Sequence, residues 1–136
     1  MKFKETSKFE LQFAGMLDKI NISYVQQYAL TDLEMAQLPS FMQPNIKRSI
    51  SRFRYDFMLP DHKLIFEIDG GLFSGGRHIH ALGYIKDRAK YLVAFLCGYH
   101  IISLPTNWFK AKRYGKASWH SLTIYELSDF LGQLKK

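Results

Sequence analysis

The stretch RYDFMLPDHKLIFEIDGG, residues 54–71, decides the predicted fold. On each side of the tripeptide PDH, apolar and polar residues alternate with a period of two, which is typical of β-strands. Pro and Asp favour a turn between two such runs. The stretch therefore predicts an antiparallel hairpin whose strands are residues 52–59 and 63–69.

The two faces of this hairpin differ in character. One face is predicted to be apolar, and its residues are Phe53, Tyr55, Phe57, Leu59, Leu64, Phe66 and Ile68. The other face carries three carboxylates, those of Asp56, Glu67 and Asp69. Clustering carboxylates in a strand is costly, because burial and mutual repulsion both disfavour their charged form.

A divalent cation would turn this repulsion into binding. If the register sets Asp56 opposite Glu67, their Cβ atoms lie about 4.5–5.5 Å apart. Two charges at that distance repel by about 3 kcal/mol at an effective dielectric constant near 20. Mg²⁺ prefers such hard oxygen ligands and leaves positions for water and phosphate. The alternative is that the carboxylates lie at a sheet edge and pair with Arg52, Arg54 or Lys63.

The elements around the hairpin are predicted from periodicity and from helix-capping residues. Residues 7–20 form an amphipathic helix with a capping box of Ser7 and Glu10. Residues 22–30 form a strand, and residues 31–51 form a loop or small insertion in which TDLEMAQL could be a short helix. A helix at 79–97, a strand at 99–104 and a helix at 119–134 follow. The apolar stripe of the helix at 79–97 consists of Leu82, Ile85, Ala89, Leu92, Val93 and Leu96.

These elements predict one domain over residues 1–136, of the α/β or α+β class, with a central mixed sheet flanked by helices. The net charge of +7, from 19 Lys and Arg against 12 Asp and Glu, suits a polyanionic partner, and the alternative is a merely soluble basic protein. No apolar run reaches the roughly 18–20 residues that span a bilayer, so we expect no membrane association. The single cysteine and the lack of an apolar leader favour a cytoplasmic location.

The order RFRYDF, LIFEIDGG, GGRH and a helix carrying IKDRAKY resembles the PD-(D/E)xK nuclease superfamily. The resemblance is closest to small phage and bacterial endonuclease-like proteins that are related to very-short-patch-repair-type endonucleases. It covers residues 7–104, and residues 52–91 carry its specific motifs. It implies a restriction-endonuclease-like core and metal-dependent cleavage of DNA.

The resemblance also implies a set of metal ligands. Asp56 is the first ligand, Glu67 the second, and the backbone carbonyl of Ile68 the third. Glu10 matches an acidic residue of the first helix that often completes such sites, although the capping box explains it equally well. The implied cofactor is Mg²⁺, with Mn²⁺ as a substitute.

The chain departs from the family at Asp69, where a lysine usually stands. That lysine would stabilise the negative charge that develops in the reaction, and Asp69 could instead be a further metal ligand or accept hydrogen bonds from the glycine-rich loop. Lys86 and Lys90, on one face of the following helix, are the candidates to replace it. We expect Lys86 to act in catalysis and Lys90 to contact a flanking phosphate. Alternatively, both lie on a solvated helix face.

The remaining polar residues are assigned to substrate binding. Arg77 could clamp a phosphate and His78 could act as a general acid or base, or the glycines before them could simply form a tight entry to the helix. Two basic stretches interleaved with aromatic residues are predicted to contact nucleic acid, or else are solvated loops. Their residues are Arg52 and Arg54 before the site, and Lys110, Lys112 and Arg113 after it.

The sequence therefore predicts a Mg²⁺-dependent endonuclease that acts on DNA, nicked or branched DNA included, in a bacterial or phage-infected cell. The alternative is a non-catalytic nucleic-acid-binding protein on a nuclease fold. The sequence does not decide the oligomeric state, although a homodimer would suit an enzyme that cuts both strands.

Overall fold

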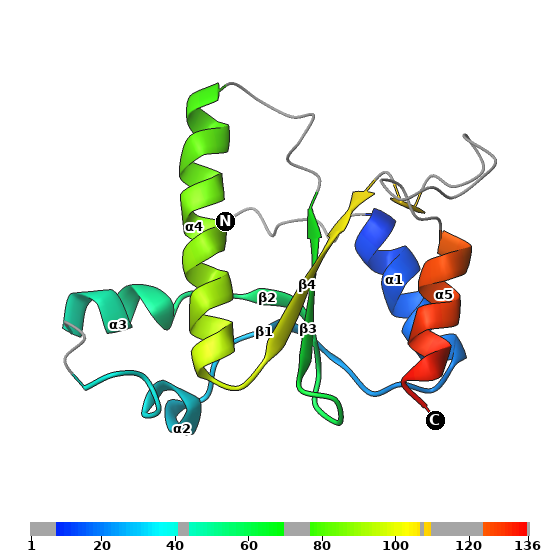
Figure 1. The fold of residues 1–136 in the computed structure, drawn as a ribbon, viewed down its shortest axis with the longest axis horizontal. Helices are drawn as coiled ribbons and strands as arrows, with labels where there is room; N and C mark the ends of the chain where they lie inside the picture. The colour runs from blue at the N-terminus through cyan, green and yellow to red at the C-terminus, as the bar shows by residue number, and fades with distance from the viewer. Residues whose placement is uncertain (1–7, 41–43, 70–76, 107, 110–123, 136) are drawn as a thin grey trace.

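Four strands form one mixed sheet in the order β1 (Val25–Tyr28), β2 (Tyr55–Leu59), β3 (Leu64–Asp69) and β4 (His100–Pro105). β1 pairs antiparallel with β2, β2 antiparallel with β3, and β3 parallel with β4 (Figure 1). The helix α4 (Arg77–Leu96) connects the two parallel strands, as a parallel connection requires a crossover. The predicted α+β class and its mixed, helix-flanked sheet are confirmed.

This computed structural model describes residues 8–40, 44–69, 77–106, 108–109 and 124–135. Besides α4, it contains α1 (Lys8–Lys19), α2 (Asp32–Met35), α3 (Pro44–Ile50) and α5 (Ile124–Gln133). The segment predicted as a loop or insertion thus holds two short helices. The predicted cap Ser7 lies outside the described residues, whereas Thr31 and Glu34 form a complete capping box at α2.

The predicted hairpin is confirmed with its register. Phe57 pairs with Phe66 and Leu59 with Leu64. His62 closes the turn with a hydrogen bond from its backbone N–H to the carbonyl of Leu59 at 3.2 Å. Continuing the register by one pair sets Asp56 opposite Glu67, which is the arrangement that the proposed metal site requires.

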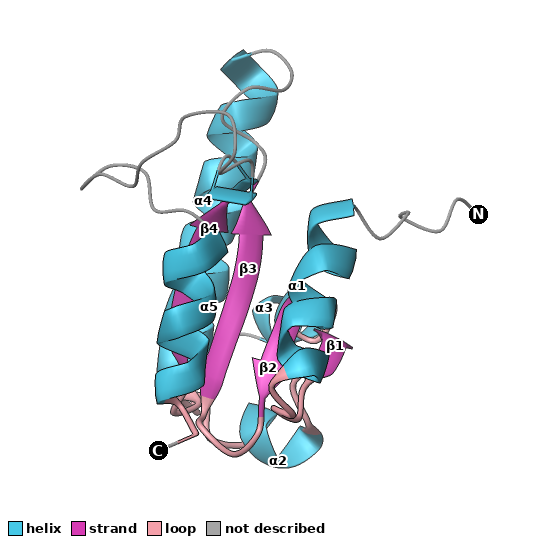
Figure 2. Ribbon diagram, turned by 90° about the vertical axis from the view of Figure 1, so that its right-hand side faces the viewer, coloured by secondary structure: helices cyan, strands magenta, loops and turns pink. Residues whose placement is uncertain are grey.

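A first apolar core fills the space between the sheet and the two helices α1 and α5 (Figure 2). Phe13 of α1 lies at its centre and is fully buried. The centre of its ring lies 4.8 Å from that of Phe57, with the two rings edge to face, and 5.1 Å from that of Phe66, with the two rings tilted. Aromatic pairs prefer both geometries to a parallel sandwich. The apolar face of the hairpin is therefore what holds α1 against the sheet.

A second core lies on the other face of the sheet, beneath α4, and Tyr55 belongs to it. We predicted Tyr55 on the same face as Phe57, and this is wrong. Tyr55 is the first residue of β2, and its hydroxyl donates a hydrogen bond to the backbone carbonyl of Lys90 in α4. The alternation of side chains therefore does not extend from Phe57 to Tyr55, although the pairing of β1 with β2 continues to Tyr28 and Tyr55.

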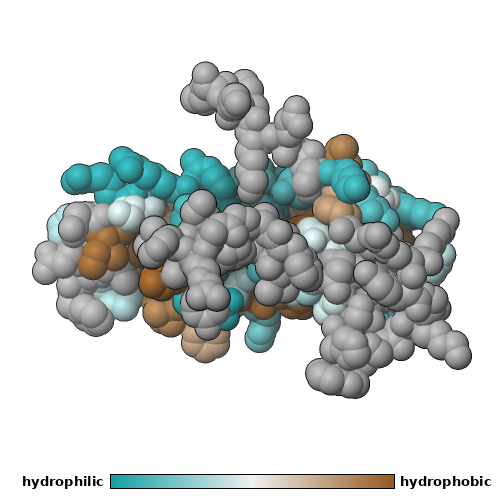
Figure 3. All heavy atoms as spheres, turned by 90° about the horizontal axis from the view of Figure 1, so that it is seen from above, coloured by the Kyte–Doolittle hydropathy of each residue, from teal (hydrophilic) through white to brown (hydrophobic). Residues whose placement is uncertain are grey.

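The predicted core face of α4 is also largely wrong. Val93, Ala94 and Cys97 pack toward the sheet, whereas Ile85, Leu92 and Leu96 of the predicted stripe are 64%, 60% and 39% exposed. The small residues at 94 and 97 allow the helix to approach the sheet closely, and periodicity alone does not reveal this. Figure 3 shows apolar residues exposed on the left of the molecule, the side on which Figure 1 draws α3 and α4.

No helix within the described part of the chain is long and apolar enough to cross a membrane.

Candidate functional site

A pocket of about 370 Å³ opens between β1, β2, β3 and the middle of α4. Its charged lining is of both signs, and the residues are Asp56, Glu67, Asp69, Asp87, Arg52, Arg54, Lys86 and Lys90. Gln27, Ile68 and Tyr91 complete it. The structure thus brings together most of the predicted site residues that it describes.

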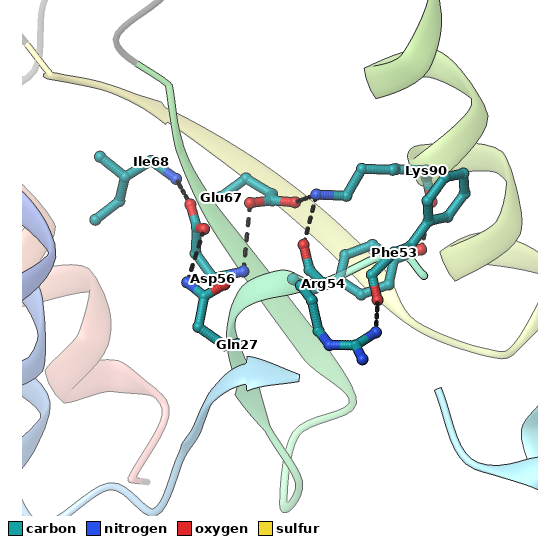
Figure 4. A network of polar contacts seen from close by, with 8 residues as sticks. Gln27, Phe53, Arg54, Asp56, Glu67, Ile68 and Lys90 are labelled. Carbon is teal, nitrogen blue, oxygen red and sulfur yellow. Dashed lines mark hydrogen bonds and ion pairs between the residues drawn. The ribbon is translucent and has the colours of Figure 1, made fainter. Parts of the chain in front are cut away.

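Asp56 is held by two neighbouring strands (Figure 4). Only 7% of the residue is exposed. Its Oδ2 accepts a hydrogen bond from the backbone N–H of Ile68 at 2.8 Å, and its Oδ1 accepts one from Nε2 of Gln27 at 3.5 Å. The carboxylate is therefore oriented by β3 on one side and by β1 on the other.

Glu67 lies beside it and is 8% exposed. Its Oε2 accepts the backbone N–H of Asp56 at 3.3 Å, and its Oε1 forms an ion pair with Nζ of Lys90. Burial, and next the neighbouring Asp56 carboxylate, raise the pKa of Glu67 to about 7, against the opposing effect of Lys90. The two carboxylates thus repel each other at neutral pH, as expected from their register.

The ammonium group of Lys90 contacts both strands of the hairpin, through Glu67 of β3 and through Arg54 and Tyr55 at the start of β2. Its Nζ donates to the backbone carbonyl of Arg54 at 2.7 Å and lies 5.0 Å from the centre of the Tyr55 ring. The hydroxyl of Tyr55 in turn donates to the backbone carbonyl of Lys90 at 2.9 Å. Only 12% of the Lys90 side chain is exposed, so its ammonium group is a defined part of the acidic centre and not a solvated helix charge.

We expected the first turns of α4, and hence Lys86, to approach the carboxylates most closely. The structure places Lys90 there and Lys86 elsewhere in the pocket lining. The reason is visible in Figure 1, where α4 begins beyond the end of β3, so that the residues level with Glu67 come later in the helix.

The donor set suits a hard divalent cation. The facing carboxylates of Asp56 and Glu67 supply oxygen ligands, and a cation would relieve the effects that raise the pKa of Glu67, which are burial and then the nearby Asp56 carboxylate. The described residues contain no group of three or more His, Cys, Asp or Glu side chains placed to hold a metal. Water and a substrate phosphate would therefore complete the coordination of Mg²⁺, as they commonly do.

Two of the predicted ligands lack such support. Glu10 is buried in the first turn of α1, and it is not part of the pocket lining. Ile68 lies in the pocket, but the contact seen there is made by its N–H, which donates to Asp56. The role of its carbonyl stays a prediction. Asp69, the residue after Ile68, also lines the pocket.

The predicted nucleic-acid contacts fall into two groups. Arg52 and Arg54 line the pocket, and Nη1 of Arg54 donates to the carbonyls of Ser51 and Phe53 at 3.1 and 2.9 Å. Arg77 and His78 begin α4, but their side chains are outside the described part of the structure. Lys110, Lys112 and Arg113 also lie outside the described residues.

Sequence reasoning missed Gln27, Asp87 and Tyr91. Asp87 lies three positions before Lys90 and four before Tyr91, so the i, i+3 and i, i+4 spacings could have indicated both residues once Lys90 was assigned. Gln27 has no such signal, because only the pairing of β1 with β2 brings it to Asp56.

Comparison of the chain with protein-family models, with curated proteins and with solved structures gave no match. The function is therefore argued from the site itself.

Proposed function

We propose that this protein is a Mg²⁺-dependent endonuclease that hydrolyses phosphodiester bonds in DNA. One observation carries the proposal, namely that Asp56 and Glu67 face each other, nearly buried, in a pocket whose lining also contains the basic residues Arg52, Arg54, Lys86 and Lys90. Burying two neighbouring carboxylates costs folding free energy, and such a pair in an accessible pocket is more typical of a functional site than of a purely structural one. The resemblance of residues 52–91 to PD-(D/E)xK nucleases points the same way.

In this proposal, Asp56 and Glu67 hold the cation, and Mn²⁺ can replace Mg²⁺. When bound, the cation would polarise the phosphate and lower the pKa of a coordinated water. Asp56 is oriented for this task by the N–H of Ile68, and Glu67 by the N–H of Asp56. These two backbone contacts keep both carboxylates in place before any ligand arrives, which lowers the cost of binding.

Lys90 would supply the positive charge that the family usually places at the position of Asp69. Its ammonium group lies at the carboxylates already, and a phosphate that enters the pocket would meet it there. Lys86, Arg52 and Arg54 also line the pocket and would hold flanking phosphates. The proposal therefore exchanges the roles that the sequence suggested for the two lysines.

The test is a cleavage assay on intact, nicked, branched and single-stranded DNA with Mg²⁺, Mn²⁺ or EDTA. Cleavage with either metal and none with EDTA is the expected result, and the preferred substrate identifies the form of DNA. Binding without cleavage on every substrate would instead favour the non-catalytic alternative, for which the aspartate at position 69 is the specific argument.

Metal binding is expected to depend on pH through Glu67. A proton competes with the cation below the pKa of about 7, because a carboxylate must lose its proton to become a ligand. The affinity for Mn²⁺ should fall about tenfold for each pH unit below 7 and level off above it. Titration calorimetry at a series of pH values measures this.

Glu67→Gln is the matched control, since it keeps the shape of the side chain and cannot titrate. It should bind Mn²⁺ weakly at every pH. An affinity of the wild-type protein that is flat across pH 7 would remove Glu67 from the ligand set.

We place the proposed activity in the cytoplasm of a bacterial or phage-infected cell. Cleavage of both strands would suit a homodimer, which stays a prediction.

A further inference from the structure

Gln27 has an unusual backbone conformation for a residue inside a strand. Its neighbours Gln26 and Tyr28 pair with Phe57 and Tyr55 of β2, yet Gln27 itself has φ of 51°. Residues other than glycine rarely adopt this left-handed region, because the Cβ atom crowds the following carbonyl oxygen.

Among the described residues, Asn21 and Lys63 share this property, with φ of 59° and 52°. Asn21 follows the end of α1, and Lys63 is the last residue of the turn between β2 and β3. A left-handed residue is common at such places, because it ends a helix or completes a turn. Gln27 is in neither position, so chain reversal does not explain it.

Burial does not explain the conformation either. The side chain of Gln27 is exposed, so no packed apolar surface holds it. What distinguishes Gln27 is its place at the acidic centre. It lies beside Asp56 across the β1–β2 ladder, it lines the pocket, and its Nε2 donates to Oδ1 of Asp56 (Figure 4).

Strained backbone of this kind persists only where the surroundings enforce it, and it gathers at functional sites. We propose that Gln27 is a positioning residue of the cation site, and that its strained backbone aims the side-chain amide at Asp56. With Ile68 holding Oδ2 and Gln27 holding Oδ1, the carboxylate cannot rotate freely about its Cβ–Cγ bond. This inference rests on the cation site of the proposed function.

A side-chain amide N–H donates to a carboxylate oxygen, so Gln27 acts on the cation site through its contact with Oδ1 of Asp56. Residues that orient ligands in this way typically change metal affinity by about 10–100-fold when they are replaced.

Two substitutions separate the amide from the strain. Gln27→Ala removes the amide and keeps a Cβ atom, so the left-handed backbone stays unfavourable. Gln27→Gly removes the amide and relieves the strain, since glycine adopts positive φ freely. We expect both variants to bind Mn²⁺ about tenfold more weakly than the wild-type protein. In EDTA, the Gly variant should unfold at a higher temperature than the Ala variant.

Titration calorimetry with Mn²⁺ and thermal unfolding in EDTA provide the two measurements. Wild-type affinity in both variants would overturn the role of Gln27 while leaving the cation site intact, because the wild-type protein itself binds. A wild-type protein that does not bind Mn²⁺ would overturn the cation site, and this inference with it. A Gly variant that unfolds below the Ala variant would show that the backbone at position 27 is not strained, and would overturn the inference on that ground.

Discussion

Asp56→Asn is expected to abolish Mg²⁺-dependent cleavage while the protein stays folded. The cation contributes several kcal/mol to stabilising the transition state, so its loss should lower the rate on the order of 10³-fold or more. Asparagine keeps an oxygen that can accept the hydrogen bond from the N–H of Ile68, which in the wild-type protein lies 2.8 Å from Oδ2 of Asp56. It also removes the negative charge that repels the Glu67 carboxylate. Cleavage of the preferred DNA substrate, measured beside thermal unfolding, checks both parts.

The choice of asparagine over alanine matters. Alanine would leave the N–H of Ile68 without its carboxylate partner, and an unsatisfied buried donor costs about 1–3 kcal/mol. Loss of activity in the alanine variant could then reflect a disturbed hairpin. Asp56→Asn should unfold at the wild-type temperature or above, and should still bind DNA. Cleavage near the wild-type rate in this folded variant would rule out the assigned metal site.

Removing the charge of Lys90 is expected to have the next largest effect. Lys90→Met keeps an unbranched side chain that can lie over the Tyr55 ring, but it has no ammonium group. The turnover rate should fall at least about tenfold, which corresponds to roughly 1.4 kcal/mol of transition-state stabilisation. Because Lys90 lowers the pKa of Glu67, the variant should also need a higher pH to bind Mn²⁺. A residue with only a packing role would leave that pH dependence unchanged.

Lys86→Met is the matched control, on the same helix and in the lining of the same pocket. It should weaken DNA binding and leave the turnover of bound substrate close to that of the wild-type protein. If Lys86→Met loses turnover and Lys90→Met keeps it, the first turns of α4 approach the reacting phosphate after all. If both variants keep turnover, neither lysine replaces the one that the family has at the position of Asp69.

The hairpin is the part of the fold that local sequence predicts best. Alternation with a period of two defines which residues share a face, and a short turn leaves little freedom for the register. The predicted metal site requires Asp56 opposite Glu67, and the observed register meets that condition. The elements after the hairpin were predicted in type and order for similar reasons, and the observed ends of α4 and β4 lie within one or two residues of the predicted ones.

The errors have a common cause, since each depends on how separate elements meet. The apolar stripe of α4 has a clear period, but the period does not say that Ala94 and Cys97 would face the sheet while Leu92 is exposed. The level of Lys90 relative to Glu67 depends on where α4 begins, beyond the end of β3. The side on which Tyr55 lies depends on its packing and its hydrogen bond with α4, and not on the alternation within β2.

By itself, the sequence determined the hairpin and the class of fold, because these follow from periodicities that act over a few residues. Only the tertiary structure decided that Lys90 meets Glu67 and that Gln27 holds Asp56. Gln27 and Asp56 are 29 positions apart in the chain, and Lys90 is 23 positions after Glu67. Contacts between residues so far apart in the sequence depend on the free energy of packing whole elements together, and local residue patterns do not predict that packing.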